Sequence, residues 1–439
     1  MRSQMPRSSR IFLGPVEIAG YYSGLEAGLR DLGLDSWAID LEPHPFRYRT
    51  DERDDPVVVR LVGRVRDHRP KPSAARALHA LWWAVWAPAR VLLLIWALVR
   101  FDTFVLSAGV TLLRGYDLPL LRLLGKRLIF VFHGSDARPA YIDGQRMAPG
   151  RALAIPECIA VARRQKSGIR RIERYADVIV AQPAFSHFFE RPVVNWFAIG
   201  VPWRDRPNAT ARERRDHAPV RILHSPSDPK VKGSERIREA VERLKAEGLP
   251  LELVELRGVA NDVVLSEMAT CDFAIDQIYS DAPMVGFATE AAAASRPAIV
   301  GSYAWAANRS AFGTIPFPPV EECTPEGLVD AVRRLTTDAA HREALGRQAS
   351  AFVHDQWSRT QIARRMLRLM EGPPPDEWLF DPRGLRYVEG CGLSREQAQG
   401  VVRAVLREGG RAALCLSDKP ELEAEFVDFA AGKGHGGLD

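Results

Sequence analysis

The amino-acid sequence predicts an α/β protein with two parallel-sheet domains and a small helical tail. Three observations lead to this prediction. Short apolar runs alternate with helical patterns, the alternation starts twice along the chain, and a polar linker separates the two rounds. Strands that alternate with helices favour parallel sheets covered on both faces. A chain of 439 residues is too long for one ordinary domain and long enough for two.

The first round occupies the N-terminal half of the chain. Its strands are predicted at Arg10–Leu13, Ser36–Leu41, Thr103–Ser107, Leu128–Phe132 and Val178–Ala181. Its helices are predicted over Ile18–Leu32, Leu78–Val99 and Arg163–Tyr175, and Gly33 ends the first of them. The intervening residues 43–73 are rich in Pro, Arg and Asp, which predicts an irregular excursion with a short strand at Val57–Val62.

The second round follows a segment dense in Arg, Asp and Pro. Its strands are predicted at Arg221–His224, Leu251–Leu256, Phe273–Ile275 and Ala298–Val300. Its helices are predicted at Ser234–Glu247, Val263–Ala269, Thr289–Ala294, Pro325–Leu335 and His341–Leu369. The predicted divisions are a first domain over residues 1–202, a linker over 203–219, a second domain over 220–372 and a tail over 373–439.

The tail begins at three consecutive prolines, Pro373–Pro375. Helices are predicted within it at Ser394–Arg407 and near Glu421–Phe429. It is too small to form much of a core alone. It can cap the first domain, pair with another subunit or do neither, and the sequence leaves these alternatives open.

Composition narrows the function classes. The net charge is +5, and acidic residues are mixed among the basic ones, so nucleic-acid binding is not expected. Anionic lipid or a phosphorylated substrate suits the same excess of positive charge. The five cysteines are far apart and form no Cys-x-x-Cys pair, which predicts free thiols, no zinc site and a cytoplasmic location. The apolar run Ile11–Leu13 is too short for a signal peptide.

One segment raises the question of a membrane. Leu78–Val99 is long enough to span a bilayer, but it carries Pro88 and Arg90 at its middle. Its four tryptophans also suit a helix that lies at the membrane interface, which would place residues 78–100 at the inner face of the membrane. The third alternative, and the one we favour from sequence alone, is a kinked helix packed on the sheet.

The stretch HSPSDPKVKG after the first strand of the second domain has the pattern of an anion site. Lys230 and Lys232 come just before a helix that opens at Ser234. Lysines beside the free N–H groups of a helix N-terminus suit a diphosphate. An exposed turn with ordinary surface lysines is the alternative.

A second such pattern lies at Gly286–Glu290. Gly286 permits close backbone approach, and the helix start that follows attracts phosphate. Glu290 in the first turn can accept hydrogen bonds from ribose hydroxyls, or it can serve only as a favourable charge at the helix N-terminus.

These two stretches, together with FHGSD at Phe132–Asp136 and the turn and helix at Gly14–Gly33, resemble the GT4 family of retaining glycosyltransferases with the GT-B fold. The resemblance covers roughly residues 10–370 in patches. It implies two Rossmann-like domains facing across a cleft. The implied reaction moves a sugar from a nucleoside-diphosphate sugar to an acceptor hydroxyl, with retention at the anomeric carbon and with neither a metal nor another cofactor. The acceptor, whether glycan, lipid-linked or small molecule, is left open.

The resemblance also assigns roles to single residues. It implies that Lys232 neutralises the donor diphosphate, that Glu290 holds the ribose and that Gly14 lines the same space. It implies that His133 and Asp136 are the catalytic residues beside the transferring sugar. The remaining implied donor contacts are Ser227, Lys230, Gly286, Phe287, Ala288 and Thr289.

The sequence departs from the family pattern at two points. Ala282 stands where the first of two family glutamates is expected, with Asp281 one place away. No arginine accompanies the lysines in the turn Ser225–Pro229. These departures leave two alternatives beside the transferase: a non-catalytic partner that scaffolds a membrane-proximal glycan assembly, and a sugar-nucleotide epimerase on the same fold.

Overall fold

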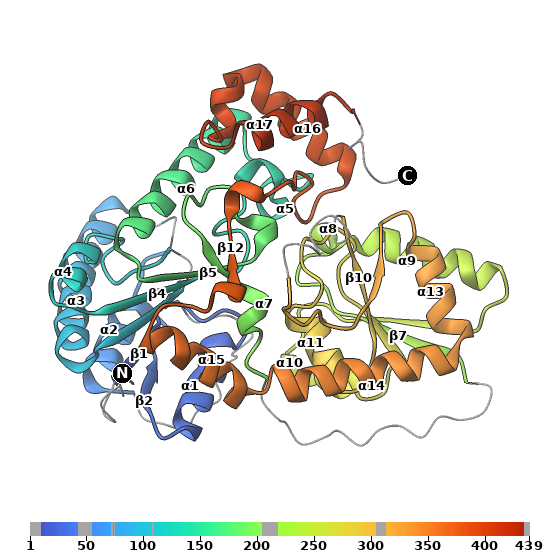
Figure 1. Ribbon diagram of the computed structural model, residues 1–439, viewed down its shortest axis with the longest axis horizontal. Coiled ribbons are helices and arrows are strands. Elements are labelled where there is room, and N and C mark those ends of the chain that lie inside the picture. Colours follow the sequence, from blue (N-terminus) through green and yellow to red (C-terminus); the bar gives the residue numbers. More distant parts are fainter. Residues whose placement is uncertain are drawn as a thin grey trace.

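The computed structural model describes residues 10–42, 55–71, 73, 75–107, 109–203, 218–303 and 313–433. The described chain forms two parallel sheets flanked by helices, with the first at the left and the second at the right of Figure 1. Most of the predicted linker, residues 204–217, lies outside the described residues.

The first sheet has seven strands in the order β12-β6-β5-β4-β3-β1-β2. All its pairs are parallel except that of β12 with β6. The fully buried Phe12 lies opposite Phe104 across the β1–β3 pair. The strands are β1 (Arg10–Gly14), β2 (Asp35–Ala38), β3 (Thr103–Ser107), β4 (Arg127–Val131), β5 (Val178–Ala181), β6 (Val193–Asn195) and β12 (Leu379–Phe380).

The second sheet has five parallel strands in the order β11-β10-β9-β7-β8. Its central strand β9 is buried throughout, as expected for a sheet covered by helices on both faces. The strands are β7 (Val220–His224), β8 (Leu251–Glu255), β9 (Phe273–Ile275), β10 (Ala298–Gly301) and β11 (Glu321–Cys323).

The helices of the first half surround the first sheet (Figure 1). They are α1 (Tyr21–Asp31), α2 (Val57–Asp67), α3 (Arg76–Arg100), α4 (Leu118–Leu123), α5 (Gly144–Met147), α6 (Ile155–Tyr175) and α7 (Trp196–Ile199). Those of the second domain and tail are α8 (Pro229–Lys232), α9 (Ser234–Ala246), α10 (Asn261–Met268), α11 (Gly286–Ala293), α13 (Leu328–Thr337), α14 (Ala339–Gln356), α15 (Arg359–Glu371), α16 (Arg395–Gly409) and α17 (Pro420–Ala430).

The two segments that connect the sheets lie side by side and run parallel where they meet. Trp203, at the end of the first half, forms an isolated bridge with Ser358, where α14 ends and α15 is about to begin. The backbone of Trp203 donates to the carbonyl of Trp357 at 2.9 Å, and Arg359 donates to the carbonyl of Trp203 at 3.1 Å. Trp357 is buried at this crossing. The two connections therefore brace each other.

The predicted single helix at His341–Leu369 is wrong, because the structure breaks it into α14 and α15 at this crossing. Helix α15 packs along α1 of the first domain, where Gly28 leaves no room for a Cβ against the carbonyl of Arg359. The chain has therefore returned to the first sheet by residue 359, ahead of the predicted division at residue 372. The break serves that return, because Ile362 and Met366 become buried in the new position.

The tail covers the first domain, which is the first of the alternatives that the sequence left open. It is not wholly helical, because β12 adds an antiparallel edge strand to the first sheet. Helix α16 packs on α6, and the buried hydroxyl of Tyr141 donates to the carbonyl of Leu414 at 3.0 Å. Lys166 of α6 pairs with Asp418 of the tail at 2.8 Å.

The predicted strand at Val57–Val62 is also wrong, because these residues begin α2. Their β-branched side chains favour a strand in isolation. However, Val59 and Val62 lie three residues apart on one helical face and are buried, while Arg60 and Leu61 are exposed. Packing of this face against α3 outweighs the local preference. The remaining predicted strands and helices occur within a few residues of their expected bounds, except that α6 begins at Ile155 and not at Arg163. The described cysteines are free thiols.

Candidate functional site

A pocket of about 300 Å³ opens at the carboxyl ends of the second sheet's strands. It is the position where ligands bind in open α/β sheets. The segments after β7 and β8 and the starts of α10 and α11 line it, and Ala19 closes it from the first domain. Its lining residues are Ala19, Ser225, Pro226, Ser227, Lys232, Gly258, Val259, Asn261, Val264, Val285, Gly286, Phe287 and Glu290.

Lys232 reaches this pocket from a short helix that its own neighbours fix. The side chain of Asp228 caps α8 by accepting from the backbone N–H groups of Lys230 and Val231. Gly233 then takes a φ of 75°, a left-handed conformation that turns the chain directly into α9. The Lys232 ammonium lies 2.8 Å from Oδ1 of Asp276, which follows β9 and is 3% exposed.

Asp276 positions the ammonium without using all of its own hydrogen-bonding capacity. Its second oxygen, Oδ2, is buried with no partner in the structure. Lys232 therefore stands at the pocket with one fixed anionic neighbour and with two further N–H donors. This arrangement places a cation with available N–H donors in the lining of the pocket.

The N-terminus of α11 provides backbone donors to the same pocket. The preceding residue is Val285, whose side chain carries no acceptor, so no side chain caps the helix. The first N–H groups of any α-helix lack a partner within the helix. Gly286 and Phe287 line the pocket, whereas Ala288 and Thr289 lie buried behind them. The hydroxyl of Thr289 is buried without a partner.

Glu290 lies beside Lys232 and the α11 start in the lining of the pocket. Its Oε1 accepts a hydrogen bond from the side-chain amide of Asn261 at 2.9 Å. Asn261, the first residue of α10, is a pocket residue that sequence reasoning missed. An isolated asparagine 29 residues before the glutamate gives no signal in the sequence.

The first domain contributes His133 through the loop that follows β4. The His133 ring packs edge-on against Tyr21, with the ring centroids 4.9 Å apart, and its Nε2 lies 3.1 Å from the hydroxyl of Tyr22. Both tyrosines begin α1, two and three residues after the pocket residue Ala19. Burial lowers the pKa of His133 to about 3, so the imidazole is neutral near pH 7.

Asp136 holds the His133 loop in shape. Its carboxylate accepts from the backbone N–H of His133 at 2.9 Å and from that of Gly134 at 2.7 Å. Burial raises the pKa of Asp136, and these hydrogen bonds oppose the rise. The structure therefore gives Asp136 contacts within its own loop, and a direct catalytic role for it stays a prediction.

Gly14 shapes the turn on the same side of the molecule. It ends β1 with a φ of 122°, and a Cβ there would overlap the carbonyl of Ile39. The turn leads to Glu17, whose carboxylate accepts from the N–H groups of Ile18, Tyr22 and Ser23. The start of α1 is thus occupied by the chain's own carboxylate, whereas the start of α11 is not.

Lys230 does not line the pocket. Its ammonium donates instead to the carbonyl of Pro149 in the first domain at 2.9 Å. Beside it, Arg151 pairs with Asp228 at 2.5 Å. Of the two lysines that the sequence singles out, Lys232 serves the pocket and Lys230 joins the two domains.

A buried ion pair crosses between the domains close to this junction. Arg138 lies 2.5 Å from Asp281, and their side chains are 7% and 2% exposed. Burial lowers the pKa of Arg138, but the attraction of Asp281 and Asp143 outweighs it and raises that pKa above its ordinary value. Asp281 is therefore engaged by the first domain. Ala282 beside it is buried and has no group that could bind a sugar.

No protein-family model matches the sequence, and no curated protein matches it significantly. Solved structures do match. Anabaena HepE in complex with UDP-glucose is 13% identical, with a TM-score of 0.50 over 82% of this chain and 98% of that one. HepE in complex with UDP and glucose is 12% identical over the same shares, again with a TM-score of 0.50. The glycosyltransferase SnogD of Streptomyces nogalater is 16% identical, covering 83% and 100%, with a TM-score of 0.39.

At sequence identities this low, structural similarity shows the fold. The chain has the GT-B architecture, with two α/β domains that each carry a parallel sheet.

Proposed function

We propose that the protein is a glycosyltransferase that moves a sugar from a nucleoside-diphosphate sugar to an acceptor hydroxyl. The observation that carries the proposal is the meeting of Lys232, the uncapped start of α11 and Glu290 in one pocket. A cation and free backbone N–H groups suit a diphosphate, and a carboxylate suits the two hydroxyls of a ribose. The GT-B architecture supports the same assignment of ligand class.

In the proposed complex, the diphosphate lies between the Lys232 ammonium and the first N–H groups of α11. These groups balance the negative charge that develops on the leaving diphosphate, which is where a fixed electrostatic environment accelerates the reaction most. Glu290 holds the ribose, and Asn261 keeps its carboxylate in place. Metal independence is part of the proposal, because these groups stabilise the leaving group themselves.

We propose retention at the anomeric carbon on the strength of the sequence resemblance to GT4 enzymes. The acceptor hydroxyl approaches the face from which the diphosphate departs. The bond from the anomeric carbon to the phosphate oxygen breaks, the bond to the acceptor oxygen forms, and the acceptor proton passes to the leaving diphosphate. His133, which is neutral, contacts hydroxyls of the transferring sugar as a hydrogen-bonding group and not as a charge.

The experiment is transfer or hydrolysis of radiolabelled sugar nucleotides by the purified full chain. UDP-glucose is the first donor to test, because HepE has been crystallised with it, and GDP-, ADP- and TDP-sugars complete the panel. We expect release of nucleoside diphosphate from at least one donor and its loss in both Lys232→Ala and Glu290→Gln. Absence of turnover and of binding for every donor would overturn the proposal.

One observation favours a second candidate, a non-catalytic partner in a glycan-assembling complex. Asp281 is paired with Arg138, and Ala282 has no carboxylate. The loop that contains both residues therefore supplies no unpaired carboxylate to bind the sugar. This candidate predicts that the protein binds a sugar nucleotide but does not turn it over. Calorimetry combined with the turnover assay separates the two.

A further inference from the structure

The exposed hydrophobic side chains of this protein gather on one part of its surface. Sixteen large hydrophobic residues are exposed among those described, and ten of them belong to α2 and α3. Four more lie at residues 116–124 next along the chain, which leaves only Val263 and Leu379 elsewhere. The ten are Val57, Leu61, Leu78, Leu81, Trp83, Val85, Val91, Leu92, Ile95 and Val99.

On α3 these side chains form a continuous stripe. Leu78, Leu81, Val85, Pro88, Leu92, Ile95 and Val99 follow one another at intervals of three and four residues, and all are exposed. This spacing places them on one face of the helix. A helix of 25 residues is about 37 Å long, so the stripe runs for roughly that length. Among the described residues, α3 is the one helix long and apolar enough to cross a bilayer.

The opposite face of α3 is committed to the protein. Trp86, Leu93, Leu94 and Ala97 are buried. The guanidinium of Arg90 donates to the carbonyls of Thr111 and Leu112. Because the inner face of α3 packs on the first domain between Trp86 and Ala97, its outer stripe is positioned to rest on a bilayer.

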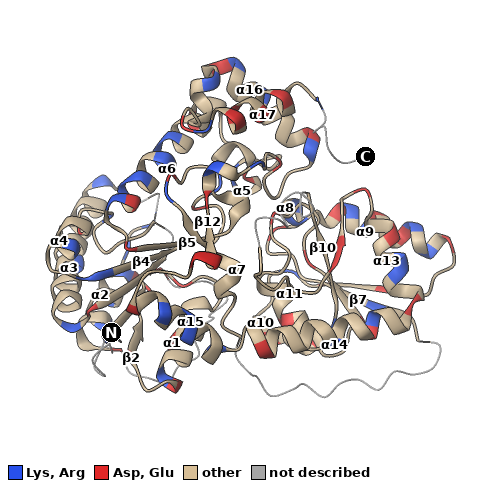
Figure 2. Cartoon of the chain, viewed as in Figure 1, with Lys and Arg blue, Asp and Glu red and all other residues tan. Residues whose placement is uncertain are grey.

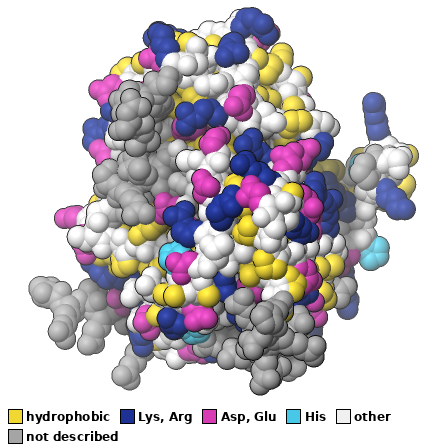
Figure 3. Space-filling view, turned by 90° about the vertical axis from the view of Figure 1, so that its right-hand side faces the viewer, with side chains coloured by type: hydrophobic (Ala, Val, Ile, Leu, Met, Phe, Trp, Pro, Cys, Tyr) yellow, Lys and Arg dark blue, Asp and Glu magenta, His cyan; other side chains and the backbone are white. Residues whose placement is uncertain are grey.

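The charges around the stripe are almost all positive. Residues 56–101 contain eight Lys or Arg and a single acid, Asp67, which gives a net formal charge of +7. Figure 2 shows the largely uncharged ribbon of α3, and Figure 3 shows Lys, Arg, Asp and Glu intermixed on the face of the second domain. Arg66 pairs with Asp67 and Arg100 with Asp35, and the α2–α3 surface still carries a clear excess of positive charge.

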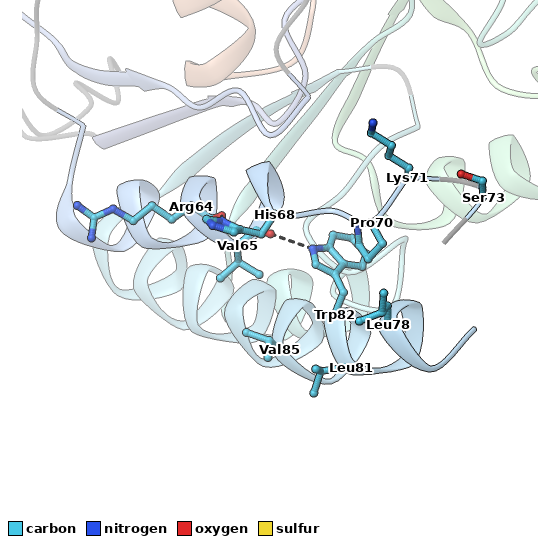
Figure 4. Close-up of a pocket in the computed structure, with 10 residues that line it drawn as sticks. All are labelled: Arg64, Val65, His68, Pro70, Lys71, Ser73, Leu78, Leu81, Trp82 and Val85. Atoms are coloured by element: carbon cyan, nitrogen blue, oxygen red, sulfur yellow. Dashed lines mark hydrogen bonds between the residues drawn. The ribbon is translucent and has the colours of Figure 1, made fainter. Parts of the chain in front are cut away.

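A pocket of about 710 Å³ lies where α2 and α3 meet. Figure 4 shows Trp82 and Leu78 of α3 beside Pro70 of the connection, with Arg64 and Lys71 at the edges. The Trp82 indole N–H donates to the carbonyl of Val65 at 2.8 Å, so its polar group is satisfied and its ring offers apolar surface. An apolar hollow with cations at its edges suits an acyl chain below an anionic headgroup.

We propose that α2 and α3 form a docking surface for an anionic lipid bilayer, with the apolar stripe at the headgroup–acyl boundary and an acyl chain in the pocket. Charge complementarity favours the bilayer over a second copy of the chain. A two-fold dimer through this face would bring the same patch against itself, and with it the same positive charges. An anionic bilayer supplies the opposite charge and an apolar layer together.

Flotation of the full chain with lipid vesicles tests the proposal without any sugar substrate, so its outcome is independent of the proposed transferase activity. We expect binding to vesicles of phosphatidylglycerol and phosphatidylcholine that weakens as salt is added, and little binding to phosphatidylcholine alone. Leu81→Asp/Ile95→Asp and Arg64→Glu/Lys71→Glu should each lower the partition coefficient by about tenfold or more.

Two control variants change the second domain in the same way. Val263→Asp replaces an exposed hydrophobic residue, and Arg243→Glu/Arg347→Glu replaces two exposed cations, so both should bind vesicles like the wild type. Equal binding by all four variants, or no binding of the wild type to anionic vesicles, would overturn the proposal. A dimer in lipid-free solution that Leu81→Asp/Ile95→Asp dissociates would also overturn it, because the stripe would then be a protein interface.

Discussion

Arg138 of the first domain and Asp281 of the second form a buried ion pair, with Nη2 2.5 Å from Oδ2 and Nε 2.7 Å from the same oxygen. The two residues are 143 positions apart in the chain. The tail bridges the two domains nearby. The backbone N–H of Gly392 donates to the carbonyl of Tyr279 in the second domain, and that of Cys391 donates to the carbonyl of Ile142 in the first. The tail and the ion pair together hold the two domains in one arrangement.

The ion pair predicts a large loss of stability when one partner is removed. Asp281→Asn leaves Arg138 buried with a weaker partner, and Arg138→Met leaves Asp281 uncompensated. Breaking a buried pair costs about 3–5 kcal/mol, because a charge remains without its counterion. Urea unfolding should show this loss for each single variant, and the double variant should recover part of it. Single variants as stable as the wild type would show that the buried pair does not contribute in this way to stability.

The two lysines of α8 predict opposite results. Lys232→Ala should weaken binding of a nucleoside diphosphate by roughly 10- to 150-fold, because a hydrogen bond to a charged group contributes about 1.5–3 kcal/mol. Lys230→Ala should bind nearly as well as the wild type, since its ammonium contacts Pro149 and not the pocket. Isothermal titration calorimetry with UDP and GDP measures both. Equal losses in the two variants would mean that the ligand lies elsewhere.

The start of α11 can be tested by removing a single N–H group. Gly286→Pro deletes the first N–H of the helix, and proline is well tolerated at this first position. Apart from its chain neighbours and its own helix, no described residue lies within 4 Å of a Cβ at residue 286, so the control Gly286→Ala adds a methyl group and keeps the N–H. Gly286→Pro should weaken diphosphate binding about tenfold, and Gly286→Ala much less. The reverse order would argue against phosphate at this helix start.

Two buried histidines predict how stability depends on pH. Burial lowers the pKa of His187 to about 3 and that of His224 to about 4, against an ordinary value of about 6.5 in the unfolded chain. Between these values the unfolded chain binds more protons, so these groups reduce stability as the pH falls below about 6.5. At pH 5 each histidine should lower the free energy of unfolding by about 2 kcal/mol, because the free energy changes by about 1.4 kcal/mol per pH unit below 6.5.

The comparison of His187→Gln with the wild type isolates this effect. Burial raises the pKa of Asp136 and of Asp143, which acts in the opposite direction, so the total slope alone is not informative. The variant should lose less stability than the wild type between pH 7 and pH 5, whatever its stability at pH 7. An identical pH dependence in urea unfolding would contradict the buried, neutral state of His187.

Most of the fold follows from local signals in the sequence. Fully apolar strands such as Val178–Ala181 and Phe273–Ile275 occur at the residues where the pattern places them, because burial on both faces requires such runs. The strand expected at Val57–Val62 is a helix because contact with α3, and not local preference, decides its structure. The break at Ser358 depends on its pairing with Trp203, 155 residues away, which no local pattern records.

The candidate site is predictable from the sequence to a similar extent as the fold. Lys232, Gly286 and Glu290 lie in motifs with a recognisable order, and the pocket brings them together. Asn261, the Arg138–Asp281 pair and the turn of Lys230 toward Pro149 depend on how distant segments pack. The sequence therefore predicts which loops carry the site, whereas the direction of each side chain follows only from the packed domains.

The most direct test of the proposed nucleotide site is a crystal structure of the full chain soaked with UDP and, in parallel, with GDP, ADP and TDP. A nucleotide should appear in the pocket at the carboxyl ends of β7 and β8. Its diphosphate should lie within hydrogen-bonding distance of the Lys232 ammonium and the first N–H groups of α11, and its ribose beside Glu290. A nucleotide bound with its diphosphate away from Lys232 and α11, or a pocket empty with all four, would contradict it.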